Sequence, residues 1–257
     1  MDLPTFFAQH PRAALAFSGG TDSAYLLRAA LSAGAEVRPY FLQTPFQPAF
    51  ERADARRLCE ALGVPLTVVG ADPLSCPEIA ANPPDRCYHC KRLLFTRLCD
   101  AAAGDGFPLM IDGTNASDDA GDRPGMRALQ ELGVLSPLRL CGITKGEVRR
   151  RSREAGLFTA DKPSYACLAT RIPVGTPLTA AALRLAEAAE ERVAALGFIG
   201  FRLRLFHGCA RLQVTAEQMP LAVAQREALE EALRADFDGV LLDLIPRPGL
   251  REEERES

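Results

Sequence analysis

The sequence predicts an α/β fold built on a parallel sheet, for three reasons. Short apolar stretches at residues 13–17, 37–42 and 66–69 are typical of buried strands. Segments with the apolar spacing of a helix follow the first two, and this alternation of strand and helix favours a parallel sheet. The first strand also runs directly into a glycine-rich turn and a helix, which is where such sheets bind ligands.

The remaining elements follow from local patterns. Thr144 and Glu147 form a capping-box pattern that opens a basic helix ending near Glu154. The other predicted elements of the first half are a short helix within 1–12, helices from about residue 21 and over 47–62, and a strand at 107–111. The second half is predicted to contain helices at 179–196 and 218–235 and strands at 201–206, 210–214 and 239–244.

A stretch without periodicity, residues 159–175, interrupts these elements. A loop of this length is usually functional or disordered, and its apolar and aromatic content argues against disorder. We place a domain boundary here, between a domain of residues 1–158 and one of residues 159–257. The tail from Arg251 to Ser257 is highly charged and is expected to fray.

The composition is that of a folded globular chain, with 47% hydrophobic residues among 257. No apolar run could span a bilayer and no signal-peptide pattern opens the chain, so we expect a cytoplasmic protein without a membrane partner. In that compartment the eight cysteines favour metal binding or catalysis over disulfides. The net charge of −3 weighs against a nucleic-acid partner.

The turn after the first strand is a candidate phosphate site. Adjacent glycines let the main chain approach a ligand closely, because they have no Cβ, and N–H groups at the start of the following helix suit an anion. Asp22 fits if a divalent cation accompanies the anion. An ordinary turn with Ser and Asp as helix caps is the alternative. The residues of this turn are Ser18, Gly19, Gly20, Thr21, Asp22 and Ser23.

Two further polar loops follow strands of the predicted sheet. Gln43 and Thr44 come after the second strand and are candidates to contact adenine or ribose, although a simple turn explains them equally well. Gly113 and Thr114 lie in the polar loop after residues 107–111, at the same edge of the sheet.

Cys87 and Cys90 are three residues apart near a predicted helix start, with Asp85 as its cap. This spacing lets two sulfurs reach one metal, and the helix end, with Lys91 nearby, is expected to lower their pKa values. Cys167 lies in the middle of the long loop, with Arg171 one helical turn later. A structural zinc is the alternative, and its fourth ligand would be His89 or Cys99.

Arg202 and Arg204 alternate along a predicted strand, so both guanidinium groups leave the same face of the sheet. Paired arginines suit a phosphate, and His207 and Arg211 lie nearby. A solvated strand face is the alternative.

Several of these stretches together resemble one family, the LarE-type sulfur transferases. The first, the Ser-Gly-Gly-x-Asp-Ser loop, is shared with other ATP pyrophosphatases of the PP-loop superfamily, whereas the rest are more specific. The resemblance covers nearly the whole chain. The matching stretches are Ser18–Ser23, Pro83–Lys91, Asp112–Asp118 with Asp122–Gly125, Lys162–Gly175 and the Arg-x-Arg-x-x-His strand that begins at Arg202.

The resemblance implies a PP-loop ATP pyrophosphatase domain, an adenine nucleotide alpha hydrolase-like fold, followed by a smaller α+β domain. It implies that ATP and Mg²⁺, held in part by Asp22, adenylylate a carboxylate of pyridinium-3,5-biscarboxylic acid mononucleotide. A sulfur nucleophile then displaces AMP to give a thiocarboxylate, on the route to the nickel-pincer nucleotide of lactate racemase.

The family has two branches that differ in the source of sulfur. In one, a single cysteine at the position of Cys167 gives up its own sulfur; in the other, three cysteines hold a 4Fe–4S cluster that carries an extra sulfide. The chain has cysteine at all three matching positions, so the cluster branch is the better match, with Cys87, Cys90 and Cys167 as ligands. Three thiolates would leave one iron open to sulfide from a donor.

The resemblance also assigns the substrate side of the site. Arg202 and Arg204 match the substrate-phosphate strand, Arg171 matches a substrate contact, and Glu190 matches an acidic position, although Glu191 is next to it. Val174 replaces the tyrosine usual in the family. A homo-oligomer is expected, with a hexamer as one form. The other cysteines are expected to be small buried hydrophobes: Cys59, Cys76, Cys99, Cys141 and Cys209.

Two other functions compete with this interpretation. A PP-loop tRNA thiolase would also join such a loop to three cysteines, but it should carry a basic face for RNA. A non-catalytic module that binds ATP or zinc is the second. Binding of tRNA and substrate-dependent release of pyrophosphate distinguish the three.

Overall fold

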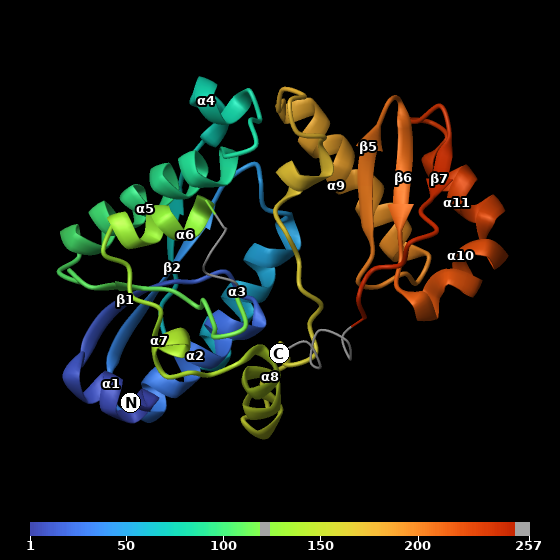
Figure 1. Cartoon of the computed structure of the whole chain (residues 1–257). Helices are drawn as coiled ribbons and strands as arrows, with labels where there is room; N and C mark the ends of the chain where they lie inside the picture. Colours follow the sequence, from blue (N-terminus) through green and yellow to red (C-terminus); the bar gives the residue numbers. More distant parts are fainter. Residues whose placement is uncertain (119–123, 250–257) are drawn as a thin grey trace.

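The computed structural model describes residues 1–118 and 124–249 and arranges them around two sheets (Figure 1). Asp122 and Arg123 of the family pattern, and the charged tail, lie outside the described residues. The first sheet has four parallel strands in the order β3-β2-β1-β4, which confirms the predicted parallel α/β fold. Among the described residues, no helix is both long and apolar enough to cross a bilayer.

The first half of the chain supplies this sheet and the helices around it. Its elements are α1 (Leu3–Gln9), β1 (Arg12–Ala16), α2 (Thr21–Ser32), β2 (Glu36–Gln43), α3 (Ala49–Ala61), β3 (Thr67–Gly70), η1 (Pro73–Ser75), α4 (Pro77–Ala80), α5 (Arg86–Gly104), β4 (Met110–Ile111), α6 (Pro124–Glu131), α7 (Pro137–Leu140) and α8 (Lys145–Glu154).

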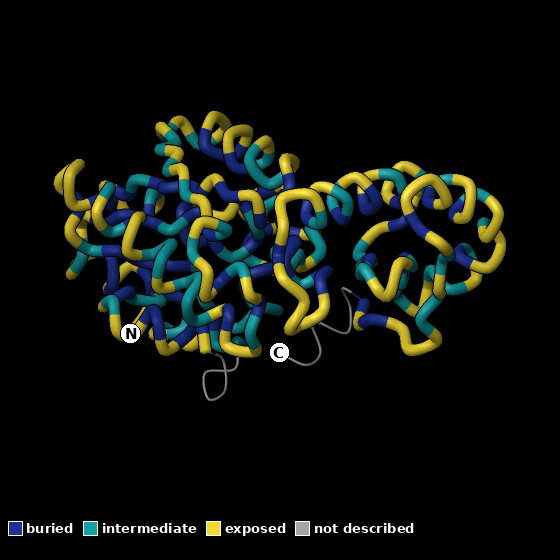
Figure 2. Tube along the Cα trace, turned by 90° about the horizontal axis from the view of Figure 1, so that it is seen from above, coloured by how far each residue is buried: buried dark blue, intermediate teal, exposed yellow. Residues whose placement is uncertain are grey.

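The sheet is buried on both faces, as parallel sheets are. Leu15 and Phe41 point into a core shared with α1, α2 and α8, whereas Tyr40 and Leu42 point into a second core shared with α5 and α6. This two-sided burial explains why residues 13–16 of β1 and 39–42 of β2 are apolar at every position. Figure 2 shows the buried segments running through the middle of this half.

The second half forms a three-stranded sheet, in which β5 and β6 are antiparallel and β6 and β7 are parallel. Helix α9 joins the two halves, because Leu183 packs with Phe46 and Ile79 of the first half while Val193 packs in the core of the second. The proposed domain division at residue 158 stays a proposal. The elements are η2 (Leu168–Arg171), α9 (Ala180–Ala195), β5 (Arg202–Phe206), β6 (Cys209–Gln213), η3 (Ala216–Gln218), α10 (Met219–Ala224), α11 (Arg226–Leu233) and β7 (Val240–Leu242).

Two predicted elements differ from those observed. The strand expected at 107–111 is only Met110–Ile111, because the N–H of Phe107 donates to the Ala102 carbonyl (2.7 Å) and closes the end of α5. The helix expected at 218–235 is two helices that break at Gln225, where the backbone leaves the helical region. The short helices α4, α6 and α7 were not predicted, since each is too brief for periodicity to reveal.

A fully buried asparagine anchors the turn between α4 and α5. The Asn82 side-chain amide donates to the carbonyls of Pro173 (2.8 Å) and Thr176 (3.1 Å), and its oxygen accepts from Arg86 Nη1 (2.8 Å). Its backbone is left-handed, with φ of 56°. Asn82 therefore ties the start of α5 to residues far along the chain, at a backbone position where asparagine is tolerated.

We expect Asn82→Ala to lower the free energy of unfolding by about 3 kcal/mol, since it removes buried hydrogen bonds and strains the left-handed backbone. Asn82→Gly is the matched control: it loses the same bonds without the strain, and should be about 1 kcal/mol more stable than the alanine variant. Urea unfolding measures both, and an alanine variant as stable as the glycine variant would contradict this account.

Candidate functional site

The glycine loop lies between β1 and α2 and is held in a fixed shape. Gly19 has φ of 70°, and a Cβ there would lie 3.0 Å from the backbone of Ala55 in α3, so only glycine fits. The hydroxyls of Ser18 and Ser23 share a hydrogen bond of 3.1 Å. The hydroxyl of Thr21 donates to the Thr159 carbonyl (2.8 Å), so the donor that Thr21 can offer an anion is its backbone N–H.

No side chain caps the start of α2, where Gly20 is the N-cap residue. The alternative of an ordinary turn capped by Ser or Asp is therefore wrong for this turn. Uncapped N–H groups at a helix N-terminus are suited to an anion.

The loop after β4 lies directly against this turn. A Cβ at Gly113 would lie 2.9 Å from the backbone nitrogen of Ser23. The buried Asp112 carboxylate holds the loop, since it accepts from the Thr114 hydroxyl (2.6 Å) and from the Ser136 hydroxyl (2.7 Å). The predicted convergence of Gly113 with the glycine loop is thus what the fold produces.

Asp22 contacts two residues that the sequence did not single out. Asn115 Nδ2 donates to one carboxylate oxygen (3.2 Å), and Lys145 Nζ lies 2.5 Å from the other. The capping box located the start of α8, but nothing in its pattern showed that Lys145 would face the glycine loop.

All three predicted cysteines line one pocket of about 280 Å³, and Ser18 of the glycine loop lines it too. Cys87 is exposed, whereas Cys90 and Cys167 are half-buried. Within residues 1–118 and 124–249, no three Cys, His, Asp or Glu side chains are placed to hold a single metal ion.

Burial has the opposite effect on the thiols to the one expected from the helix start. It raises the pKa of Cys90 to about 12 and also raises the pKa of Cys167, and the neighbouring Arg86 offsets this only in part. The prediction of a lowered pKa is therefore wrong for Cys90, because desolvation outweighs the positive charge.

Arg86, at the start of α5, joins that helix to the loop of residues 159–175 that contains Cys167, here called the cysteine loop. Its guanidinium donates to the Ala169 carbonyl (3.1 Å), which is two residues after Cys167, and Nη2 lies 3.5 Å from Cys87 Sγ. The side chain is buried. Sequence reasoning missed this residue because an arginine beside C-x-x-C gives no signal of its distant partner.

His89 and Cys99, the candidates for a fourth zinc ligand, do not line the pocket of the three cysteines. The ring nitrogens of His89 lie 3.3 Å from carboxylates of Glu78 and Asp85, and Cys99 packs in the core beneath α5. Asp85 occupies the N-cap position of α5 but makes no capping hydrogen bond. Of the five other cysteines, only Cys59 is fully buried; the remaining four, Cys76, Cys99, Cys141 and Cys209, are half-buried.

Arg171 and Glu190 form a buried, bidentate ion pair, with N–O distances of 2.7 and 3.2 Å. The Tyr165 hydroxyl and the backbone N–H of Leu203 also donate to Glu190. Glu190 thus joins the cysteine loop, α9 and β5, while Glu191 is exposed. Their proposed contacts to substrate stay proposals, and in this structure both side chains are occupied within the protein.

Arg202 and Arg204 lie among other cations. Burial, and then the charges of Arg247 and Arg171, lower the pKa of Arg202 to about 10. Its buried Nε has no hydrogen-bond partner among the described residues. Arg204 donates to Gln213 (3.0 Å). Such a group of partly buried cations would be stabilised by a bound anion.

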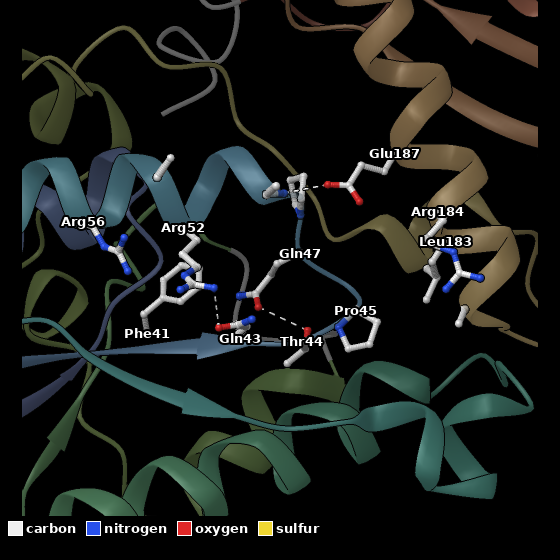
Figure 3. Close-up of a pocket in the computed structure, with 14 residues that line it drawn as sticks. Phe41, Gln43, Thr44, Pro45, Gln47, Arg52, Arg56, Leu183, Arg184 and Glu187 are labelled. Carbon is white, nitrogen blue, oxygen red and sulfur yellow. Dashed lines mark hydrogen bonds between the residues drawn. The ribbon is translucent and has the colours of Figure 1, made fainter.

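Gln43 and Thr44 lie in a separate cavity of about 540 Å³ between α3 and α9 (Figure 3). Gln43 accepts from Arg52 (2.9 Å), and the Thr44 hydroxyl accepts from the N–H of Phe46 (3.1 Å). Gln47 lines both this cavity and the cysteine pocket, so the two are neighbours. The structure does not bring Gln43 and Thr44 into the pocket that holds Ser18.

No family model matches the chain, but individual proteins resemble it over most of its length. A pyridinium-3,5-bisthiocarboxylic acid mononucleotide synthase of Lactiplantibacillus plantarum is 31% identical over 91% of this chain and 86% of its own length. An uncharacterised protein of Synechocystis is 34% identical over 85% of this chain and 82% of its own. A tRNA-specific 2-thiouridylase of Frankia alni is 29% identical, over 59% of this chain and 53% of its own.

The thiouridylase match supports the PP-loop ATP pyrophosphatase fold for the parallel sheet. Since the match covers about half of that protein's length, it carries no conclusion about tRNA.

Glu51 of α3 provides a pH test of the interior beside the cysteine loop. Burial raises its pKa to about 7 from 4.5, and the charges of Lys162 and Arg171 offset this only in part. Because the folded protein holds this proton more tightly than the unfolded chain does, wild-type stability from this group falls as pH rises from 4.5 to 7.

We therefore expect Glu51→Gln to be more stable than wild type by about 2 kcal/mol at pH 8, with the difference fading toward pH 4. Thermal unfolding across this pH range measures it. A difference that does not change with pH would contradict a raised pKa at Glu51.

Proposed function

The chain belongs to the LarE-type family of sulfur transferases, and from that premise we propose that it converts a carboxylate of pyridinium-3,5-biscarboxylic acid mononucleotide to a thiocarboxylate. It is an ATP-dependent sulfurtransferase of the PP-loop class. One observation carries the proposal: the pocket lined by three cysteines is also lined by Ser18 of the glycine loop. Nucleotide chemistry and sulfur chemistry can therefore meet on one substrate atom.

In the first step a substrate carboxylate oxygen attacks the α-phosphorus of ATP. The bond from that phosphorus to the bridging oxygen breaks, pyrophosphate leaves with the electron pair, and an acyl adenylate forms. The uncapped N–H groups of α2 and the hydroxyls of Ser18 and Ser23 would bind the leaving pyrophosphate. The Asp22 carboxylate would hold Mg²⁺ against the phosphate oxygens.

In the second step a sulfide attacks the carbonyl carbon, the bond to the AMP oxygen breaks, and AMP leaves. The products are a thiocarboxylate, AMP and a proton, so charge and atoms balance without a redox partner. We propose that this sulfide is delivered at Cys87, Cys90 and Cys167, where a 4Fe–4S cluster, when bound, would present an iron without a protein ligand.

The donor set supports this choice. Cys87, Cys90 and Cys167 line one pocket, and three thiolates are the ligands that a cluster with one open iron would take. Because Cys90 and Cys167 hold their protons in this state, binding must release protons.

The substrate phosphate is proposed to bind at Arg202 and Arg204. Both side chains are partly buried on one face of β5, and an anion would relieve the mutual repulsion of these cations. Arg171 of the cysteine loop pairs with Glu190, which in turn accepts from the N–H of Leu203 in β5, so the loop and the arginine strand are joined. The phosphate would thus be anchored while a carboxylate reaches toward the glycine loop.

A tRNA thiolase and a non-catalytic ATP or zinc module remain the competing functions. The net charge of −3 favours the small nucleotide over tRNA. A homo-oligomer is part of the proposal and comes from the family. Binding of tRNA that weakens steeply with salt would favour the thiolase, and substrate-dependent pyrophosphate release excludes the non-catalytic module.

Anaerobic purification followed by iron, acid-labile sulfide and zinc analysis tests the metal assignment. We expect about four irons and about four or more sulfides per chain, with little zinc. Removal of the metal with a chelator should abolish sulfur transfer and leave ATP binding in place. One zinc per chain with no sulfide, in protein never exposed to air, would contradict the cluster.

We expect Cys167→Ala to reduce thiocarboxylate formation by at least about 100-fold, because loss of a metal ligand exceeds the usual cost of losing a group that only supports one. Substrate-dependent pyrophosphate release should stay near the wild-type rate. Cys141→Ala is the matched control, because Cys141 is a half-buried cysteine that packs against the core around Leu15 and does not line the cysteine pocket. Loss of both steps in a folded Cys167→Ala protein would refute this division of roles.

A further inference from the structure

Both oxygens of the Asp22 carboxylate already have partners within the protein. Lys145 Nζ lies 2.5 Å from one of its oxygens and Asn115 Nδ2 lies 3.2 Å from the other. The pair is largely shielded from solvent, with side-chain exposures of 16% for Lys145 and 24% for Asp22. Whatever cation joins Asp22 during turnover must displace this ammonium or share the oxygen with it.

The base of the lysine is fixed while its side chain can turn. Its backbone N–H donates to the Ser117 hydroxyl (2.9 Å), and Thr144 caps α8 through the N–H of Glu147. Helix α8 also packs along α2. Four rotatable carbons therefore carry the ammonium from a rigid position beside the glycine loop.

We propose that Lys145 is an exchangeable counter-ion of the nucleotide site. Its ammonium neutralises Asp22 while no divalent cation is bound, and it moves to a phosphate oxygen when Mg²⁺ takes that place. The inference rests on the proposed function, because it assumes that the phosphates of ATP bind at the glycine loop.

The chemistry favours an exchange over coexistence. A divalent ion and an ammonium repel each other at one carboxylate oxygen, and the divalent ion binds oxygen ligands more strongly. The phosphates that arrive with Mg²⁺ offer the displaced ammonium new oxygens within reach of the same helix start. Lysine binds phosphate as a point charge and needs no fixed orientation to do so.

The exchange would stabilise the site both before ATP binds and during transfer of the adenylyl group. Before ATP binds, the pair prevents a half-buried, unneutralised carboxylate beside the glycine loop. As the bond to the α-phosphorus breaks, negative charge builds on the leaving pyrophosphate, and an ammonium already on those oxygens stabilises it. Lys145 is thereby a catalytic residue that contacts the nucleotide, and it was not assigned by any sequence pattern.

A second lysine supplies the comparison. Lys162 Nζ lies 2.7 Å from Asp54, with side-chain exposures of 17% and 29%, so this pair matches the first in distance and burial. Asp54 lies in the middle of α3 and not at the start of a helix that follows the glycine loop. Lys162→Met therefore controls for loss of a lysine–aspartate pair as such.

The experiment measures two affinities of the full-length protein in opposite directions. Mn²⁺ binding without nucleotide is followed by electron paramagnetic resonance, and binding of Mg²⁺–pyrophosphate by calorimetry. We expect Lys145→Met to bind Mn²⁺ about fivefold more tightly, because its competitor is gone. We expect it to bind Mg²⁺–pyrophosphate at least about tenfold more weakly, because a charged phosphate contact is lost.

Further variants make the outcome specific. Adding Asp22→Asn to Lys145→Met should abolish the gain in Mn²⁺ affinity, whereas Lys162→Met should change neither affinity. Lys145→Arg, which keeps the charge, should bind Mn²⁺ like wild type and supplies the test if the methionine variant does not fold. Unchanged Mn²⁺ affinity in folded Lys145→Met, or a fall in both affinities, would overturn the exchange.

Failure of the inference and failure of the proposed function give different results. If wild-type protein binds Mg²⁺–pyrophosphate but Lys145→Met does so equally well, the exchange is wrong and the nucleotide site stands. If wild-type protein binds neither Mg²⁺–ATP nor Mg²⁺–pyrophosphate, the proposed function itself is wrong.

Discussion

The buried ion pair between Arg171 and Glu190 is the interaction on which the rest of the site depends. It joins the cysteine loop to α9, and through the N–H of Leu203 it reaches the strand that carries Arg202. Removing one partner of a buried ion pair lowers the free energy of unfolding by about 3–5 kcal/mol, because the other charge stays buried. The relative placement of the sulfur site and the arginine group follows from this pair.

A second buried arginine fixes the other side of the same loop. Arg86 reaches the Ala169 carbonyl from α5, and Asn82 holds Arg86 in turn. The segment around Cys167 has little regular secondary structure, so guanidinium groups satisfy carbonyls that a sheet or helix would otherwise pair. The cysteine loop is thus rigid without being regular, and it can present a thiol at a defined point of the pocket.

Two places in this structure favour an anion. The uncapped start of α2 does so at the glycine loop, and Arg202 with its cationic neighbours does so at β5. Burial raises the pKa of Cys90 and of Cys167, which favours their neutral thiols. In the proposed reaction the two anion sites would take the triphosphate of ATP and the phosphate of the substrate.

The sequence by itself determined the parallel sheet, the glycine loop before α2 and the C-x-x-C at the start of α5, because each is a local pattern of spacing and turn chemistry. Only the tertiary structure decided which distant residues meet: Cys167 with Cys87, Lys145 with Asp22, Arg86 with the cysteine loop. Burial in the tertiary structure also raises the pKa of Cys90, against the local expectation. The physical reason is that these contacts depend on which elements pack against each other. Periodicity along the chain shows that a face is buried, but it does not show which element covers that face.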